Sequence, residues 1–223
     1  MINERFADNT SEQSVATRLR RQRFQILVNM LHERPGPVRL LDIGGTQGYW
    51  DMMLTSVALP PTLHVTLLNL EVTPVARRNF TATAGDARAM PQFADKQFDI
   101  VFSNSTIEHV GTWADQERMA REVRRLGRQY CVQTPNRYFP IESHFVFPCF
   151  QFLPLVLRVW LAQHFALGSY PRIPDRQTAL REIASIRLLS RAEFQRLFPE
   201  ATLYDEKYYG LTKSFVAYTP RRR

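Results

Sequence analysis

A glycine-rich turn directly after a short apolar run constrains this chain more than any other feature. Residues 38–43 read VRLLDI and are followed by Gly44, Gly45 and Gly48. An apolar run of this length that ends at glycines is typical of a buried strand. Glycines let the backbone approach a ligand closely and leave amides pointing toward it, and Asp42 could accept a hydrogen bond from a cationic amine. The turn therefore predicts a ligand site at the end of the first strand.

Further apolar runs recur at a spacing that predicts an α/β fold. Strands are expected at residues 63–70, 98–103, 129–133, 201–206 and 214–219. Helical periodicity predicts an N-terminal helix over 11–34 and another over 113–126. Strands that alternate with helices are typical of a Rossmann-like, doubly wound and mostly parallel sheet, which the C-terminal pair closes with an antiparallel strand. We expect one domain over residues 1–223, with a substrate loop and apolar lid inserted at 136–185.

The turn does not fit the dinucleotide fingerprint G-x-G-x-x-G. Counted from Gly44, Thr46 and Tyr49 occupy the positions of the second and third glycines. Without them, close packing against a pyrophosphate is not expected. The spacing acidic-x-G-x-G-x-G is met by Asp42, Gly44 and Gly48, with Thr46 in place of the middle glycine.

With this turn, the chain resembles the class I S-adenosylmethionine-dependent methyltransferases, in particular the small-molecule branch with a type 11 domain. The resemblance covers about residues 38–133. After the turn, the matching segments follow in order: LLNLE ending at Glu71, GDAR at 85–88, and FDIVFSNSTIEHV at 98–110. The joint spacing of these segments makes the resemblance specific.

The resemblance implies S-adenosyl-L-methionine as the cofactor. Glu71 would accept the ribose hydroxyls, Asp86 the adenine amine, and the Ala87 amide would meet a ring nitrogen. The full set of expected cofactor residues is Asp42, Gly44, Gly45, Thr46, Gly48, Glu71, Asp86, Ala87, Ser103 and Asn104. Ser103 and Asn104 belong to it because ligands bind at the carboxyl ends of strands in open α/β sheets.

Two histidines are candidates for acting on the methyl acceptor. A base is needed only if the nucleophile starts protonated, as a hydroxyl does. His109 ends the run SNSTIEH, and His144 lies in a loop after the strand at 129–133, which we expect to contact the substrate. Other expected substrate residues of that loop are Asn136, Arg137, Tyr138 and Glu142. Glu142 could orient His144.

The acceptor class stays open between three hypotheses. All of the net charge of +8 lies in residues 112–223, which favours anionic partners. The first hypothesis is methylation of a hydrophobic or lipid-linked small molecule. The second is an RNA or protein methyltransferase that uses the basic half, although no RNA-binding module is evident and nucleic acid is not expected as a partner. The third is a cofactor-binding partner protein without turnover.

Residues 145–168 form the most apolar segment, with Arg158 as its one clear charge. The continuous helical part, 155–167, is too short to span a bilayer. The segment could be buried in a core or homodimer contact, line a pocket for a hydrophobic acceptor, or contact a bilayer surface. We favour a lid that closes over a hydrophobic acceptor.

Cys131 and Cys149 show neither zinc nor redox spacing, and the first ten residues lack the apolar region of a signal peptide. We therefore expect a cytoplasmic protein, with peripheral membrane contact as one interpretation, and no metal site.

Overall fold

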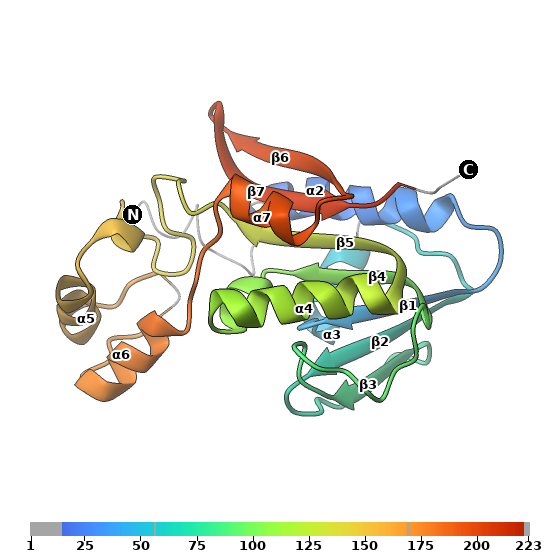
Figure 1. The fold of residues 1–223 in the computed structure, drawn as a ribbon, viewed down its shortest axis with the longest axis horizontal. Helices are drawn as coiled ribbons and strands as arrows, with labels where there is room; N and C mark the ends of the chain where they lie inside the picture. Colours follow the sequence, from blue (N-terminus) through green and yellow to red (C-terminus); the bar gives the residue numbers. More distant parts are fainter. Residues whose placement is uncertain (1–14, 56, 169, 221–223) are drawn as a thin grey trace.

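The computed structural model describes residues 15–55, 57–168 and 170–220, which build a seven-stranded sheet covered by helices on both faces (Figure 1). The strand order is β3-β2-β1-β4-β5-β7-β6, and β7 runs opposite to the other six strands of this sheet. The strands are β1 (Val38–Ile43), β2 (Leu63–Asn69), β3 (Phe80–Ala84), β4 (Phe98–Asn104), β5 (Gly127–Pro135), β6 (Thr202–Tyr208) and β7 (Leu211–Tyr218). The predicted doubly wound sheet with an antiparallel closing strand is confirmed.

Helices connect the strands and extend from the sheet. The α-helices are α2 (Val15–His32), α3 (Gln47–Leu54), α4 (Trp113–Leu126), α5 (Leu155–His164), α6 (Arg176–Ala184) and α7 (Arg191–Leu197), and the 3₁₀ turns are η1 (Ile107–His109) and η2 (Phe150–Phe152). Among the described residues, no helix is long and apolar enough to cross a membrane.

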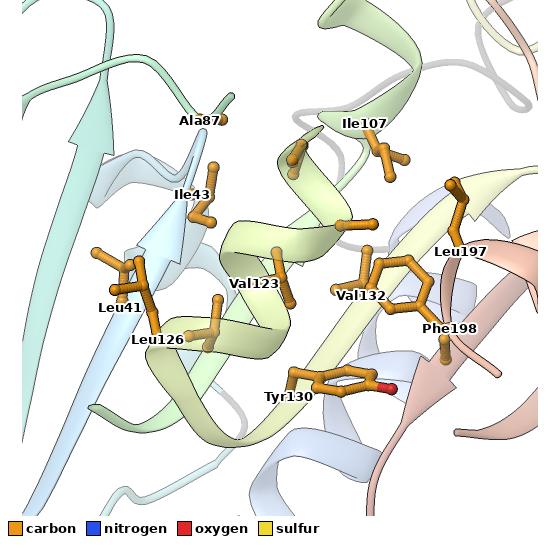
Figure 2. Packing of buried hydrophobic residues seen from close by; sticks show 14 of the residues in the cluster. Leu41, Ile43, Ala87, Ile107, Val123, Leu126, Tyr130, Val132, Leu197 and Phe198 are labelled. Atoms are coloured by element: carbon orange, nitrogen blue, oxygen red, sulfur yellow. The ribbon is translucent and has the colours of Figure 1, made fainter. Parts of the chain in front are cut away.

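Two apolar layers follow from the alternation of side chains along the strands. On one face, Leu41 and Val132 pack against α4 and α7, together with Val123 and Leu197 (Figure 2). On the other face, Leu40 and its neighbours pack against α2 and α3. Buried strands with both faces covered leave the strand ends as the place for a ligand.

The helix expected over 113–126 has these bounds in the structure. Thr112 and Asp115 form a capping box at its start, in which each side chain accepts from the other residue's backbone amide. This arrangement satisfies two amides that have no partner within the helix and fixes the start of the helix at Trp113.

Several expected bounds change. β5 runs over Gly127–Pro135 rather than 129–133, and the helix expected over 155–167 ends at His164. Residues 11–14 of the expected N-terminal helix lie outside the described residues.

The chain leaves the sheet after β5 and returns before α7. Asn136 and Leu189 form an isolated parallel bridge where it leaves and returns. Between them, α5 and α6 pack on each other at the strand-end side of the molecule (Figure 1). They enclose their own small cluster, which includes Phe145, Phe150 and Val159, so this segment forms a satellite beside the sheet.

Candidate active site

A cavity of about 570 Å³ opens at the carboxyl ends of β4 and β5. Its walls come from α2, the start of α3, the loop 139–146 and the start of β7. Of the expected cofactor residues, it brings together Thr46, Gly48 and Asn104, and it adds both candidate histidines, His109 and His144. A volume of this size is typical of a small-molecule site.

The turn before α3 requires glycine at two positions. Gly44 has a φ of +78°, a conformation that other residues rarely adopt. At Gly45, a Cβ would lie 1.8 Å from the Asp42 carboxylate. Thr46, by contrast, has an ordinary φ of −128° and accepts a hydrogen bond from the Tyr49 amide, which caps α3. Threonine therefore replaces the family's glycine here without strain.

Asp42 lies beneath this turn and outside the cavity wall. Its side chain is 1% exposed, and Oδ2 accepts a 2.7 Å hydrogen bond from the Trp50 indole nitrogen. Oδ1 is buried without a hydrogen-bond partner among the described residues. Burial raises the pKa of Asp42 to about 7, against the effect of the Trp50 hydrogen bond. A buried oxygen without a partner suits the expected contact with a cationic amine.

The structure places the other expected cofactor residues outside the cavity. Glu71 is exposed on the loop after β2. Both carboxylate oxygens of Asp86 accept hydrogen bonds from Arg88, which lower the pKa of Asp86. Ala87 is buried in the α4 layer, and the buried hydroxyl of Ser103 donates to the Ile43 carbonyl. Their cofactor roles stay predictions.

The two candidate histidines meet at the cavity wall. Their Nε2 atoms are 3.1 Å apart, and their rings are nearly perpendicular, with centroids separated by 4.9 Å. His109 ends η1 after β4, whereas His144 belongs to the loop after β5. Because β4 and β5 are adjacent parallel strands, their carboxyl ends bring both loops to one place.

Glu142 fixes the position of His144. Its Oε1 lies 2.6 Å from His144 Nδ1, and its Oε2 accepts from the backbone amides of His144 and Phe145. Burial lowers the pKa of His144, but the hydrogen bond and charge of Glu142 outweigh it and the pKa is raised. Burial and the charge of His144 lower the pKa of His109 to about 4. Glu142 therefore serves as the predicted orienting carboxylate.

The remaining expected substrate residues point elsewhere. Asn136 donates to the Thr212 carbonyl and accepts from the Tyr138 amide, which anchors the loop to β7. Arg137 lines a second, smaller cavity. Tyr138 is 63% exposed and stacks on Phe152. None of the three lines the larger cavity, so their expected substrate contacts find no support in this geometry.

A basic part of the cavity wall was not predicted from the sequence. Arg20 and Arg23 of α2 and Lys213 of β7 line the cavity, and Arg23 forms a 3.0 Å ion pair with the buried Glu206. Burial lowers the pKa of Lys213, with contributions from both arginines. Three cations beside one carboxylate suit a ligand with an anionic group. These residues lie far from the motifs in sequence, and no local pattern marks them.

A further missed residue is Glu108, next to His109. It is fully buried, and burial raises its pKa to about 7. Its Oε2 accepts from the Thr134 hydroxyl, and its Oε1 lies 4.0 Å from His144 Nε2. The pair Glu-His within the run SNSTIEHV is the feature that could have pointed to it.

Comparison with known proteins identifies this arrangement. Residues 41–130 match the model of a family described as a methyltransferase domain. This stretch of the chain is a methyltransferase domain. The expected class is thereby confirmed, together with S-adenosylmethionine as the cofactor of that class.

Relatives of this methyltransferase domain carry little further functional description. The uncharacterized protein Rv1509 of Mycobacterium tuberculosis strain H37Rv is 34% identical over 77 residues, which are 34% of this chain and 26% of the relative. Its counterpart in strain CDC 1551, the uncharacterized protein MT1557, matches equally. The chain thus matches about a quarter of the length of these curated relatives.

Solved structures share the fold of the methyltransferase domain. The CMeT domain of the citrinin polyketide synthase superposes with a TM-score of 0.56 at 14% identity, and the match covers 91% of this chain and 52% of that chain. An S-adenosylmethionine-dependent methyltransferase from Methanosarcina mazei gives 0.51 at 14% identity, covering 86% of this chain and 95% of its own. At sequence identities this low, the structural similarity shows a shared fold and nothing more.

The residues present fit the cofactor at its methionine end. The two required glycines, the buried oxygen of Asp42 without a partner and the cavity beside Gly48 together form a cradle for an amino-acid group. Asp42 and the turn would hold that part. The bound cofactor would supply an electrophilic methyl group on a sulfonium.

Proposed function

We propose that this chain transfers a methyl group from S-adenosylmethionine to a hydrophobic or lipid-linked small molecule bound in the cavity. The observation that carries the proposal is the shared cavity, which joins the glycine turn at one wall to His109 and His144 at another. An acceptor placed beside the histidines would lie next to the cofactor's methionine end. Positioning of this kind supplies much of the rate in a displacement reaction.

The transfer forms one bond and breaks one. The acceptor's nucleophile attacks the methyl carbon, the carbon–sulfur bond breaks, and its electron pair remains on sulfur as S-adenosylhomocysteine. A hydroxyl acceptor also gives up its proton. We propose that His109 and His144 activate the acceptor at this step, because they are the titratable side chains on that wall together with Glu142.

The satellite supports an acceptor of apolar character. The loop 139–146 lines the cavity with Phe139, Ile141 and Val146. Phe150 is buried in the satellite cluster, whereas Phe152 and Trp160 are exposed, and none of these three lines the cavity. The part that covers the acceptor is thus the loop 139–146, with α5 and α6 behind it.

The outer surface of the satellite supports contact with a lipid surface. Val156 is 76% exposed, Phe165 51% and Trp160 47%. Exposed Arg172 lies in the connection before α6, and exposed Arg176 begins that helix. Apolar and aromatic side chains beside arginines are typical of interfacial helices. We propose that this face lets the enzyme meet a lipid-linked acceptor at a membrane surface.

A radiolabelled methyl donor tests the function. The protein is incubated with lipid, RNA and protein fractions of a cell extract, and label is expected in the lipid fraction. His144→Ala should reduce the label by about 10²–10⁴-fold, whereas His164→Ala, a histidine of α5 outside the cavity, should not.

The other fractions decide against the proposal. Label in RNA or protein would favour a macromolecular acceptor that uses the basic half of the chain. Cofactor binding without label in any fraction would favour a partner protein without turnover.

A further inference from the structure

The ends of three side chains converge at the histidine wall. One ligand atom each from Glu108, His109 and His144 lies within 4.8 Å of the others. His109 and His144 line the cavity, and Glu108 lies buried behind them. We propose that these three residues bind a divalent transition-metal ion of the zinc type, with a free coordination position facing the cavity.

The distances suit a shared ion. Zinc binds imidazole nitrogen at about 2.0–2.1 Å and carboxylate oxygen at about 2.0–2.2 Å. Two ligand atoms on one such ion are therefore about 3.0–3.4 Å apart. The Nε2 atoms of His109 and His144 are already 3.1 Å apart. Glu108 Oε1, 4.0 Å from His144 Nε2, needs only a small shift.

The buried carboxylate gives an independent reason for a cation. Glu108 is 0% exposed, and its Oε1 has no hydrogen-bond partner among the described residues. A buried polar atom without a partner is costly unless a ligand satisfies it. Its other oxygen accepts from Thr134, which leaves Oε1 directed toward His144.

The surroundings of His144 resemble those of a metal ligand. A ligating histidine usually donates its second ring N–H to a carboxylate, which fixes the ring and its tautomer. Glu142 provides this contact at 2.6 Å from Nδ1. His144 Nε2, which faces His109 Nε2 at 3.1 Å, is then the coordinating atom. Two imidazoles and one carboxylate suit zinc, iron or cobalt better than magnesium.

The inference rests on the proposed function only for the ion's role. Three protein ligands and an open position are typical of a catalytic rather than a structural site. A cation there lowers the pKa of a hydroxyl that coordinates it. We infer that the acceptor carries such an oxygen, whose proton passes to water, and that the histidines act through the ion.

Metal titration tests the site without any methyl donor or acceptor. Tag-free, chelator-treated full-length protein in a Cys149→Ser background is titrated with Zn²⁺ by calorimetry and with Co²⁺ by visible absorption. We expect one ion per chain. Glu108→Gln and His144→Ala should each weaken binding by at least about tenfold, and His164→Ala should not.

Melting temperatures in the absence of metal show which variants fold. If His144→Ala does not fold, the isosteric variant Glu108→Gln still tests the site. No binding, or binding that is equal in Glu108→Gln and His164→Ala, would overturn the site and leave a hydrogen-bonded histidine pair. Because the titration involves no methyl transfer, an inactive protein that still binds Zn²⁺ through these residues would refute the proposed function alone.

Discussion

The indole nitrogen of Trp50 donates a 2.7 Å hydrogen bond to Asp42, so the first turns of α3 hold the carboxylate at the end of β1. This contact satisfies one oxygen of a side chain that is almost fully buried. The fold therefore keeps an acidic group beneath the glycine turn at a cost in desolvation.

The first prediction concerns pH and Asp42. Because burial raises its pKa from 3.8 to about 7, the folded chain binds a proton that the unfolded chain has released. This contribution to stability is complete below the unfolded pKa and is lost as the pH rises toward 7. Relative to Asp42→Asn, the wild type should lose up to about 4 kcal/mol of unfolding free energy between about pH 4 and 8.

Urea denaturation at several pH values measures this difference. Asp51→Asn is the control, because the hydrogen bond from Arg77 lowers the pKa of Asp51 and gives the opposite sign. A difference between wild type and Asp42→Asn that does not change with pH would mean that Asp42 is ionised in the folded chain.

The second prediction separates the fold from the cofactor site at two glycines. A Cβ at Gly48 has open space, with no atom within 4 Å, whereas a Cβ at Gly45 overlaps the Asp42 carboxylate. Gly48→Ala should stabilise α3 by up to about 1 kcal/mol yet weaken cofactor binding, because its methyl group enters the cavity. Gly45→Ala should lower the melting temperature. Calorimetry measures the cofactor affinity of the two variants, and thermal unfolding measures their melting temperatures. Unchanged cofactor affinity in Gly48→Ala would mean that the methionine end of the cofactor binds elsewhere.

The third prediction keeps Glu71 as the ribose contact. Glu71→Ala would leave two ribose hydroxyls without partners, which should weaken cofactor binding by roughly 1–3 kcal/mol. Glu117→Ala on α4, a residue that lines neither cavity, is a control of the same chemistry. Isothermal calorimetry with equal affinities for both variants would remove Glu71 from the site.

The fourth prediction distinguishes the two sides of α5. Trp160 is 47% exposed and Val159 only 5%. Trp160→Ser should leave the melting temperature unchanged and reduce sedimentation with anionic lipid vesicles. Val159→Ala should instead cost about 1–3 kcal/mol of stability, since a buried valine loses packing. Equal vesicle binding by wild type and Trp160→Ser would exclude this face as the lipid contact.

Local patterns sufficed for the sheet and for α4, because apolar runs and helical periodicity are encoded within a few residues. They failed where contacts join distant segments. His109 and His144 emerged as alternatives from the sequence, yet the adjacency of β4 and β5 makes them a pair. Arg20 and Lys213 share a wall only because α2 and β7 meet there. Such tertiary neighbours leave no periodic trace in the chain.

The bridge between Asn136 and Leu189 has a consequence for how the segment between these two residues could vary. The two ends of the satellite are already held side by side, and the Arg137 amide donates to the Leu189 carbonyl. A replacement segment of another length would begin and end at the same pair of bridged residues. The entropic cost of closing such a segment rises only slowly with its length. The sheet could thus carry interchangeable segments of different length between these two positions, while the glycine turn after β1 stays unchanged.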